Sequence, residues 1–324
     1  MGNKNKVVIL TTEPRKGLDA VTDAVVSDLI VTLKMYEAMG VSFIVRFGHE
    51  MNGSWYPWSQ QPGLFVDKFR RISKALRKGT RHATMIFCPT LGTGYPFVGG
   101  EYFPICGTDS GNSPHTVPQG KQSDCKLLDT NGDGMFTASD DMFSPYWPGD
   151  EYVDWVGSSI YWWGRSYPWG ENELPSPGYL YDVLMGRNEK VSSDSVPDFY
   201  RTYSQKKNIA MVITETAALY NLCDVDPSTK ACKANKAKNL ITDAVEHDIK
   251  SRWVEQVFSL QGPRSTRKAF PNIKIISWFN VKKQESEVRG NTVDWTTYTS
   301  DKLKESLIKT LSGRHNRRPY WITG

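Results

Sequence analysis

The sequence predicts an α/β protein built on a parallel sheet, either open or closed into a barrel. Short apolar runs alternate with segments whose apolar residues recur at helical spacing, a pattern typical of parallel strands joined by helices. The chain has 324 residues, of which 39% are hydrophobic and 23% charged. Such a chain is globular and long enough for one large domain or two ordinary ones.

Six short apolar runs are predicted to form the strands, at residues 7–10, 41–45, 83–87, 155–161, 209–213 and 273–279. Two of them, 41–45 and 209–213, are almost continuously apolar, as expected of strands buried on both faces of a sheet. Amphipathic helices are predicted at 27–39, 65–76, 240–256 and 302–311. Ser27 is expected to cap the first helix and Gly40 to end it.

Two predicted strands are followed by a glutamate, Glu50 and Glu215. The carboxyl ends of parallel strands form the active face of a barrel, and alternation along the strand would place Arg46 on the same face as Glu50. Two carboxylates about 5–5.5 Å apart can cut a glycosidic bond, because one protonates the leaving oxygen while the other attacks the anomeric carbon. Arg46 would keep a neighbouring carboxylate ionised, and Trp55 and Trp58 would give the acid a less polar setting.

Aromatic residues are abundant in a chain that is polar on average. Eleven Trp and fifteen Tyr are present, and they cluster around residues 55–58, 146–147, 161–163, 167–169 and 278–279. Large rings fill hydrophobic cores, and they also stack on the flat faces of sugars. Their repetition beside the predicted strand ends favours sugar binding.

Residues 46–58 read Arg-Phe-Gly-His-Glu-Met-Asn-Gly-Ser-Trp-Tyr-Pro-Trp, and this segment resembles the acid/base signature of glycoside hydrolase family 26. Residues 213–217, Ile-Thr-Glu-Thr-Ala, are similar to the nucleophile segment of that family, which often has Gly at the last position. The family consists of (β/α)8 barrels, mainly β-mannanases, with some enzymes that act on mixed-linkage glucan or β-1,3-xylan. Its Pro-Asn after the fifth strand is replaced here by Pro89-Thr90.

The resemblance implies an incomplete barrel. The family has its acid/base on the fourth strand and its nucleophile on the seventh, so the six runs would be strands 3–8 of a (β/α)8 TIM-type barrel. Strands 1 and 2 would then lie upstream of Met1, together with the signal peptide that the chain lacks. The catalytic barrel is expected to span residues 1–312, with a loop insertion at 91–148 and a basic tail at 313–324.

The resemblance also implies roles for single residues. Glu50 would be the acid/base and Glu215 the nucleophile, with Tyr161 donating a hydrogen bond to Glu215. Trp55 would stack near the scissile linkage, and Trp278 would form the floor of the pocket. His49 and Arg46 complete the expected substrate-binding set, His49 by touching a substrate hydroxyl or steadying Glu50.

These inferences predict a retaining endo-β-glycanase that hydrolyses β-1,4-mannan-type polysaccharide by double displacement. Mixed-linkage β-glucan and β-1,3-xylan are the alternative substrates. A rival from another class is a truncated, non-catalytic carbohydrate-binding barrel, because a barrel without its first two strands would be left open. A melting curve, together with a comparison of the chain length against the genomic sequence upstream of Met1, would separate the two.

A second motif is independent of catalysis. Residues 129–140 follow the spacing of a calcium loop, in which oxygen ligands alternate and a glycine permits the tight turn. The candidate ligands are Asp129, Asn131, Asp133, Met135 through its carbonyl, and Asp140. The sequence predicts a structural Ca²⁺, although a turn rich in Gly and Asp also explains the run. A calcium-dependent interaction protein is a third possible function.

The cysteines and charges indicate the compartment and the partners. Cys106 with Cys125 and Cys223 with Cys232 would close two loops, and Cys88 would be a buried free thiol, so a secreted, extracellular protein is expected. The net charge of +5 is spread along the chain, and the basic tail is interpreted as a solvated end. No run approaches the roughly 18 apolar residues of a membrane helix. We expect no nucleic-acid or membrane partner.

Overall fold

The computed structural model describes residues 6–92, 94–104, 122–165, 169–187, 198–222, 224–225, 232–233, 243–258 and 264–312. The chain forms two compact units. The first comprises Met1–Ser159 and Met185–Met211, and the second comprises Ile160–Leu184 and Val212–Gly324. The predicted basic tail at 313–324 lies outside the described residues.

A six-stranded sheet has its strands in the same order as the chain. The order is β1 (Lys6–Thr12), β2 (Val41–Phe47), β3 (Ala83–Phe87), β4 (Trp155–Ser159), β5 (Met211–Thr216) and β8 (Ile273–Trp278). The strands are parallel, with Ile9 opposite Ile44 and Val45 opposite Met85. Sequential parallel strands are those of a (β/α) barrel. The predicted fold class, an incomplete TIM-type barrel, is therefore confirmed.

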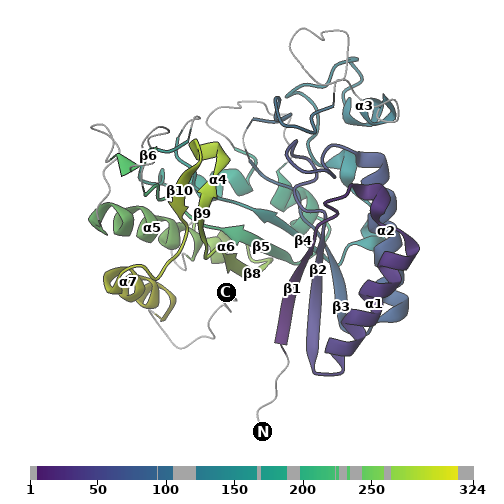
Figure 1. Cartoon of the computed structure of the whole chain (residues 1–324), viewed down its shortest axis with the longest axis horizontal. Helices are drawn as coiled ribbons and strands as arrows, with labels where there is room; N and C mark the ends of the chain where they lie inside the picture. Colours follow the sequence, from purple (N-terminus) through teal and green to yellow (C-terminus); the bar gives the residue numbers. More distant parts are fainter. Residues whose placement is uncertain are drawn as a thin grey trace. The chain divides into compact units, whose positions relative to one another are not determined.

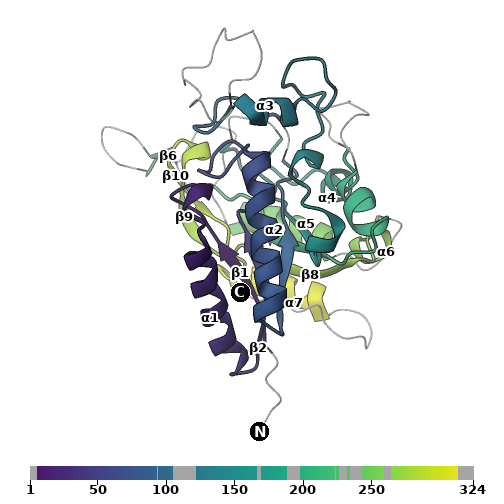
Figure 2. The ribbon, with the colours of Figure 1, turned by 90° about the vertical axis from the view of Figure 1, so that its right-hand side faces the viewer.

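The first unit carries helices α1 (Asp23–Glu37), α2 (Pro62–Gly79) and α3 (Gln122–Leu128). Figures 1 and 2 show α1 and α2 side by side along β1, β2 and β3. The predicted cap of α1 was wrong. Thr22 Oγ1 accepts a hydrogen bond from the Val25 amide, so the helix begins before Ser27. Gly40 follows the end of α1 at φ 83°, a left-handed conformation that glycine adopts without strain.

Short 3₁₀ segments and a π-helix complete the first unit. They are Leu18–Ala20, Ser144–Tyr146, Asp150–Tyr152 and the π-helix Tyr200–Gln205. Phe65 and Phe69 of α2 are fully buried, as is Phe87 of β3. Tyr146 is likewise buried, so this member of the predicted aromatic cluster at 146–147 belongs to the core.

In the described part of the second unit, four helices accompany two short hairpins. The helices are α4 (Tyr179–Leu184), α5 (Asp243–Val257), α6 (Thr266–Ala269) and α7 (Asp301–Ser312). The hairpins pair β6 (Asp224–Val225) with β7 (Cys232–Lys233) and β9 (Lys282–Glu285) with β10 (Asn291–Asp294). A 3₁₀ turn, Ser286–Val288, lies between β9 and β10. Both hairpins were absent from the sequence prediction because their strands have only two or four residues.

Strand β1 is an edge of the sheet. Its Val7 is 49% exposed and its Val8 38% exposed, which agrees with the expectation of an open sheet edge. Within the described ranges, no helix combines the length and the apolar character needed to cross a membrane.

Candidate active site

Glu50 lies on a sharp turn of the backbone at the end of β2. Gly48 and Glu50 both have positive φ, 49° and 54°, a conformation that is uncommon for a residue other than glycine. The Gly48 amide donates to the Thr12 carbonyl at 3.0 Å, and the Glu50 amide donates to the Cys88 carbonyl at 2.8 Å. The strand therefore ends at Phe47, and the predicted alternation that gave Glu50 the same face as Arg46 does not extend through this turn.

The Glu50 side chain is held by Trp55. The indole Nε1 of Trp55 donates to Glu50 Oε2 at 3.0 Å, and the indole is 37% exposed. Gly53 allows this arrangement, because a Cβ at that position would lie 2.5 Å from the Trp55 ring. Phe97 meets the same ring edge-on, with centroids 5.1 Å apart. Trp55 thus combines a hydrogen bond to a carboxylate with exposed aromatic surface.

His49 is a buried neutral imidazole. Burial, followed by the charges of Arg46 and Arg15, lowers its pKa from 6.5 to about 2. Its ring is tilted against those of Tyr56 and Trp58, with ring centroids 5.1 and 5.7 Å apart. Among the described residues, its buried Nδ1 has no hydrogen-bond partner. His49 is therefore suited to hydrogen bonding rather than to proton transfer near neutral pH.

Arg46 links the ends of three neighbouring strands. The side chain is only 1% exposed. Its Nε donates to Cys88 Sγ at 3.3 Å and its Nη2 donates to Ser159 Oγ at 2.8 Å. Cys88 is a buried free thiol, as predicted. Arg46 thus brings a buried positive charge to the carboxyl ends of β2, β3 and β4.

Asn52 fastens the turn to the segment after β3. Its amide nitrogen donates to the Thr90 carbonyl at 3.0 Å, and its oxygen accepts from the Thr90 amide at 2.9 Å. Ser54 Oγ donates to the Phe97 carbonyl at 2.6 Å. Asn52 is completely buried. The Pro89-Thr90 corner, where the family has Pro-Asn, contacts the turn through main-chain atoms.

In the second unit, Glu215 is held by Tyr161. The Tyr161 hydroxyl donates to Glu215 Oε2 at 2.6 Å, which is the hydrogen bond that the family resemblance implies. The main chains are also joined, since the Ile160 amide donates to the Glu215 carbonyl at 2.9 Å. A carboxylate that accepts a short phenolic bond has a fixed orientation.

Aromatic rings surround Tyr161. Trp163, Phe279 and Trp295 have ring centroids 5.9, 5.8 and 5.3 Å from that of Tyr161. Trp278 is 6% exposed and its Nε1 donates to the Trp295 carbonyl at 2.7 Å. Trp278, the expected floor of a pocket, is therefore buried and hydrogen-bonded to the main chain of Trp295.

Two tryptophans in the second unit that contact the Glu215 region were not predicted from the sequence. Trp295 follows β10, and Trp253 of α5 donates from Nε1 to Thr216 Oγ1, next to Glu215, at 2.9 Å. Neither belongs to an aromatic cluster in the sequence. The only available signal was the high total of tryptophans.

The calcium-loop carboxylates accept hydrogen bonds from the loop itself. Asp129 accepts from the amides of residues 132, 133 and 134, and Asp140 accepts from those of residues 130, 131 and 137. Asn131 Oδ1 accepts from the Asp133 amide, and Met135 is 48% exposed. In the part of the chain that the structure describes, no group of three or more His, Cys, Asp or Glu is arranged to hold a metal. The calcium site stays a prediction.

The predicted disulfides are described only in part. Cys125, in α3, is disulfide-bonded. Its predicted partner Cys106 lies outside the described residues, as does Cys223 of the second predicted pair. Cys232 belongs to β7.

Among known proteins, matches to this chain are found in solved structures. No family model and no curated protein matches the chain. Bacillus subtilis mannanase BCman is 17% identical, with a TM-score of 0.32, over 62% of this chain and 42% of that chain. The YdhT protein from Bacillus subtilis is 14% identical, with a TM-score of 0.41, over 88% and 52%. A Cellulomonas fimi endo-β-1,4-mannanase double mutant is 16% identical, with a TM-score of 0.38, over 69% and 42%. The chain thus spans between 42% and 52% of the length of these structures.

Proposed function

We propose that the chain is a retaining endo-β-glycanase that hydrolyses β-1,4-mannan-type polysaccharide. Glu215 attacks the anomeric carbon while Glu50 protonates the leaving oxygen. Water, deprotonated by Glu50, then releases the sugar from Glu215 with its configuration retained. Mixed-linkage β-glucan and β-1,3-xylan are the alternative substrates.

One observation carries the proposal. Each of two glutamates at the carboxyl end of a sheet strand accepts a hydrogen bond from an aromatic donor, Trp55 for Glu50 and Tyr161 for Glu215. The carboxyl ends of parallel strands carry the catalytic groups of barrel enzymes. An aromatic donor can fix a carboxylate and offer a ring face to a sugar. This combination supports carbohydrate chemistry.

The surroundings of Glu50 support its role as the acid/base. Trp55 occupies one carboxyl oxygen, Oε2, and the residue is half-buried rather than fully enclosed. His49 is the neighbouring titratable side chain, but its low pKa leaves it without a proton to donate at neutral pH. Glu50 is therefore the group at this turn that can exchange a proton with a leaving oxygen.

The first experiment measures sugar release from mannan, galactomannan, barley β-glucan and xylan. We expect release from mannan, retention of configuration by NMR, and loss of release in Glu215→Ala while polysaccharide binding persists. Glu305→Ala is the matched control, since Glu305 is an exposed glutamate of α7. Hydrolysis that survived Glu215→Ala would overturn the assignment. Binding without hydrolysis in the parent protein would instead favour the non-catalytic alternative.

Chemical rescue separates the two roles. Azide can take the place of the missing nucleophile in Glu215→Ala and yields a glycosyl azide of inverted configuration. In Glu50→Ala, azide can intercept the glycosyl-enzyme and yields a glycosyl azide of retained configuration. Both outcomes follow from double displacement, and the opposite configurations would require the two roles to be exchanged.

We also propose that the protein works in an oxidising, extracellular compartment. The disulfide at Cys125 supports this location. Mass spectrometry of unreduced peptides is expected to detect a disulfide-linked peptide that contains Cys125 and Cys106. A free Cys125 in protein from the native source would contradict the proposed compartment.

A further inference from the structure

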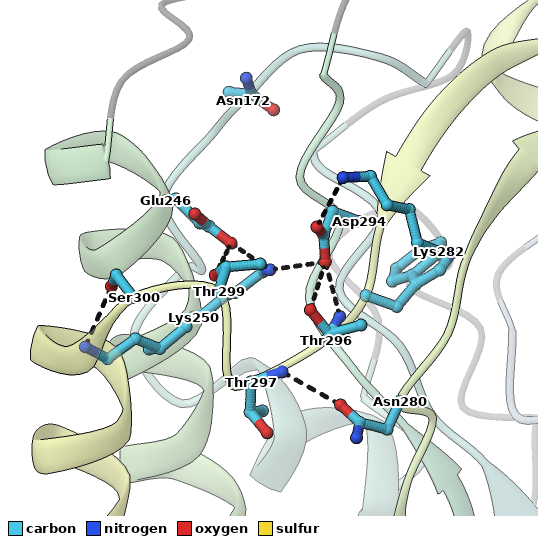
Figure 3. Close-up of polar contacts among 12 residues, drawn as sticks. Asn172, Glu246, Lys250, Asn280, Lys282, Asp294, Thr296, Thr297, Thr299 and Ser300 are labelled. Carbon is cyan, nitrogen blue, oxygen red and sulfur yellow. Dashed lines mark hydrogen bonds and ion pairs between the residues drawn. The ribbon is translucent and has the colours of Figure 1, made fainter.

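A buried lysine pairs with two carboxylates in the second unit. Lys250 of α5 is completely buried, and its Nζ lies 2.5 Å from Glu246 Oε1 and 3.2 Å from Asp294 Oδ1 (Figure 3). The carboxylates are themselves only 7% and 2% exposed. Buried charges are costly unless they are paired and hydrogen-bonded. The side chains of Lys250, Glu246 and Asp294 therefore form one hydrogen-bonded group, the Lys250 cluster.

Threonines of the same region complete the hydrogen bonding. Thr299 Oγ1 donates to Glu246 Oε1 at 2.5 Å, and Thr296 donates to Asp294 Oδ1 from its amide and its hydroxyl, at 2.9 and 2.6 Å. Although burial opposes ionisation, the Thr296 hydroxyl and the Lys250 charge lower the pKa of Asp294. Asp294 is thus fixed as a carboxylate.

Asp294 leads directly to the Glu215 site. It is the last residue of β10, and the next residue is Trp295, whose ring packs edge-on against Tyr161 and Trp163 at 5.3 and 4.9 Å. Tyr161 donates to Glu215 at 2.6 Å. A shift of Asp294 would move the Trp295 backbone and hence the ring that confines Tyr161.

Helix α5 also contacts the strand that carries Glu215. Lys250 and Trp253 are three residues apart and therefore lie on one face of the helix. Trp253 donates to Thr216 Oγ1, adjacent to Glu215. Residues of a single helical face thus contact both the strand that carries Glu215 and the segment that carries Trp295.

We propose that Lys250 is a positioning residue, which sets the orientation of Tyr161, and through it of Glu215, by holding Asp294 and the Trp295 that follows it. The inference rests on the proposed function of Glu215. Lys250 does not touch the substrate, so its loss impairs turnover rather than binding.

The test compares two lysines that share Asp294. Lys250→Met/Glu246→Gln removes the buried charge pair and keeps an acceptor for Thr299, whereas Lys282→Met removes a lysine that is 53% exposed and 3.5 Å from Asp294 Oδ2. The double variant is expected to lower kcat on mannan on the order of 10- to 100-fold with KM nearly unchanged, as displacement of a catalytic group does. Lys282→Met is expected to keep the parent kcat.

A double-mutant cycle tests the route through Tyr161. If Lys250 acts by orienting Tyr161, the kcat loss from the charge-pair variant shrinks to about twofold in a Tyr161→Phe background. Equal losses in both backgrounds would overturn the proposal. Phe69→Leu, in the buried core of α2, serves as the control for general loss of stability and is expected to leave kcat intact.

Near-ultraviolet circular dichroism reports on positioning without any activity. The coupled rings of Tyr161, Trp163 and Trp295 give a signal that depends on their mutual orientation. We expect this signal to change in the charge-pair variant and in Lys250→Met, and to persist in Lys282→Met and Phe69→Leu. An unchanged spectrum in a folded charge-pair variant refutes the positioning role. Absence of glycan hydrolysis by the parent refutes the proposed function alone.

Discussion

The two glutamates are supported in different ways. The side chain of Glu50 is held within its own segment, because its backbone is left-handed and Trp55 binds it, and the turn is then fastened to Thr90 by Asn52. Glu215 depends on distant segments, because Tyr161 lies 54 residues away, while Trp253 and Trp295 come from later parts of the chain. One carboxylate is oriented by a local turn and the other by tertiary packing.

This difference has consequences for robustness. The Trp55 contact lies within a short segment, so changes outside residues 46–58 and the few positions that they contact, such as Cys88 and Thr90, should affect Glu50 little. The support of Glu215 is shared among packed side chains, and neighbours in such networks couple energetically. Substitutions that are distant from Glu215 in sequence should therefore alter the orientation of its side chain.

The largest expected effect separates the roles of the two carboxylates. Glu215→Gln is expected to lower kcat on mannan on the order of 10⁴-fold or more, because the covalent step is lost. Glu50→Gln is expected to cost about 10²- to 10⁴-fold on mannan, but to spare the first step with aryl glycosides whose leaving group needs no proton. Burst kinetics measure this difference. Equal losses on both substrates would mean that Glu50 is not the acid.

The next effect is the pH dependence of stability in the first unit. His49 has a pKa of about 2 in the folded chain against 6.5 in the unfolded chain. Between these values the unfolded chain binds a proton that the native chain does not, so stability is complete above pH 6.5 and falls as the pH falls. The slope is up to about 1.4 kcal/mol per pH unit.

Urea unfolding as a function of pH checks this expectation. His49→Gln should remove the contribution, whereas His82→Gln should not, since His82 is exposed. A His49→Gln variant with the parent pH slope would show that His49 has the same pKa in the folded and unfolded chain.

A smaller effect compares the two aromatic donors. Hydrogen bonds to charged groups contribute about 1.5–3 kcal/mol, so Tyr161→Phe is expected to lower kcat on the order of 10- to 100-fold. Trp55→Phe removes a longer bond from a partly exposed ring and is expected to cost about threefold to tenfold. Tyr298→Phe, at an exposed tyrosine, is the control. A larger loss from Trp55→Phe would reverse the comparison and identify stacking on substrate as its main role.

The smallest expected effect is that of calcium. We propose a structural Ca²⁺ at residues 129–140, which would stabilise the first unit by about 1–3 kcal/mol when saturated. Calorimetry in Ca²⁺, Mg²⁺ and EDTA checks this expectation. The melting temperature should rise in Ca²⁺ alone, and Asp129→Ala should remove the rise. The same melting curve in all three conditions would refute the site.

The sequence anticipated the fold because strands and helices are repeated local patterns. The six apolar runs match the six strands of the sheet within a few residues at each end. The predicted ends of the helices were less accurate. Helix α1 begins at Asp23 because Thr22 caps it, and hydrophobic periodicity does not indicate which of several hydroxyls will accept a hydrogen bond from a helix amide.

The sequence alone determined the two glutamates and the side-chain partners near Glu50, since residues 46–58 contain both Glu50 and the Trp55 that binds it. Only the tertiary structure decided that Gly48 and Glu50 leave the extended conformation, that His49 is buried as a neutral ring, and that Trp295 confines Tyr161. Burial and ring contacts join residues separated by tens to hundreds of positions. No local spacing encodes such contacts, because they exist only once the segments have packed together.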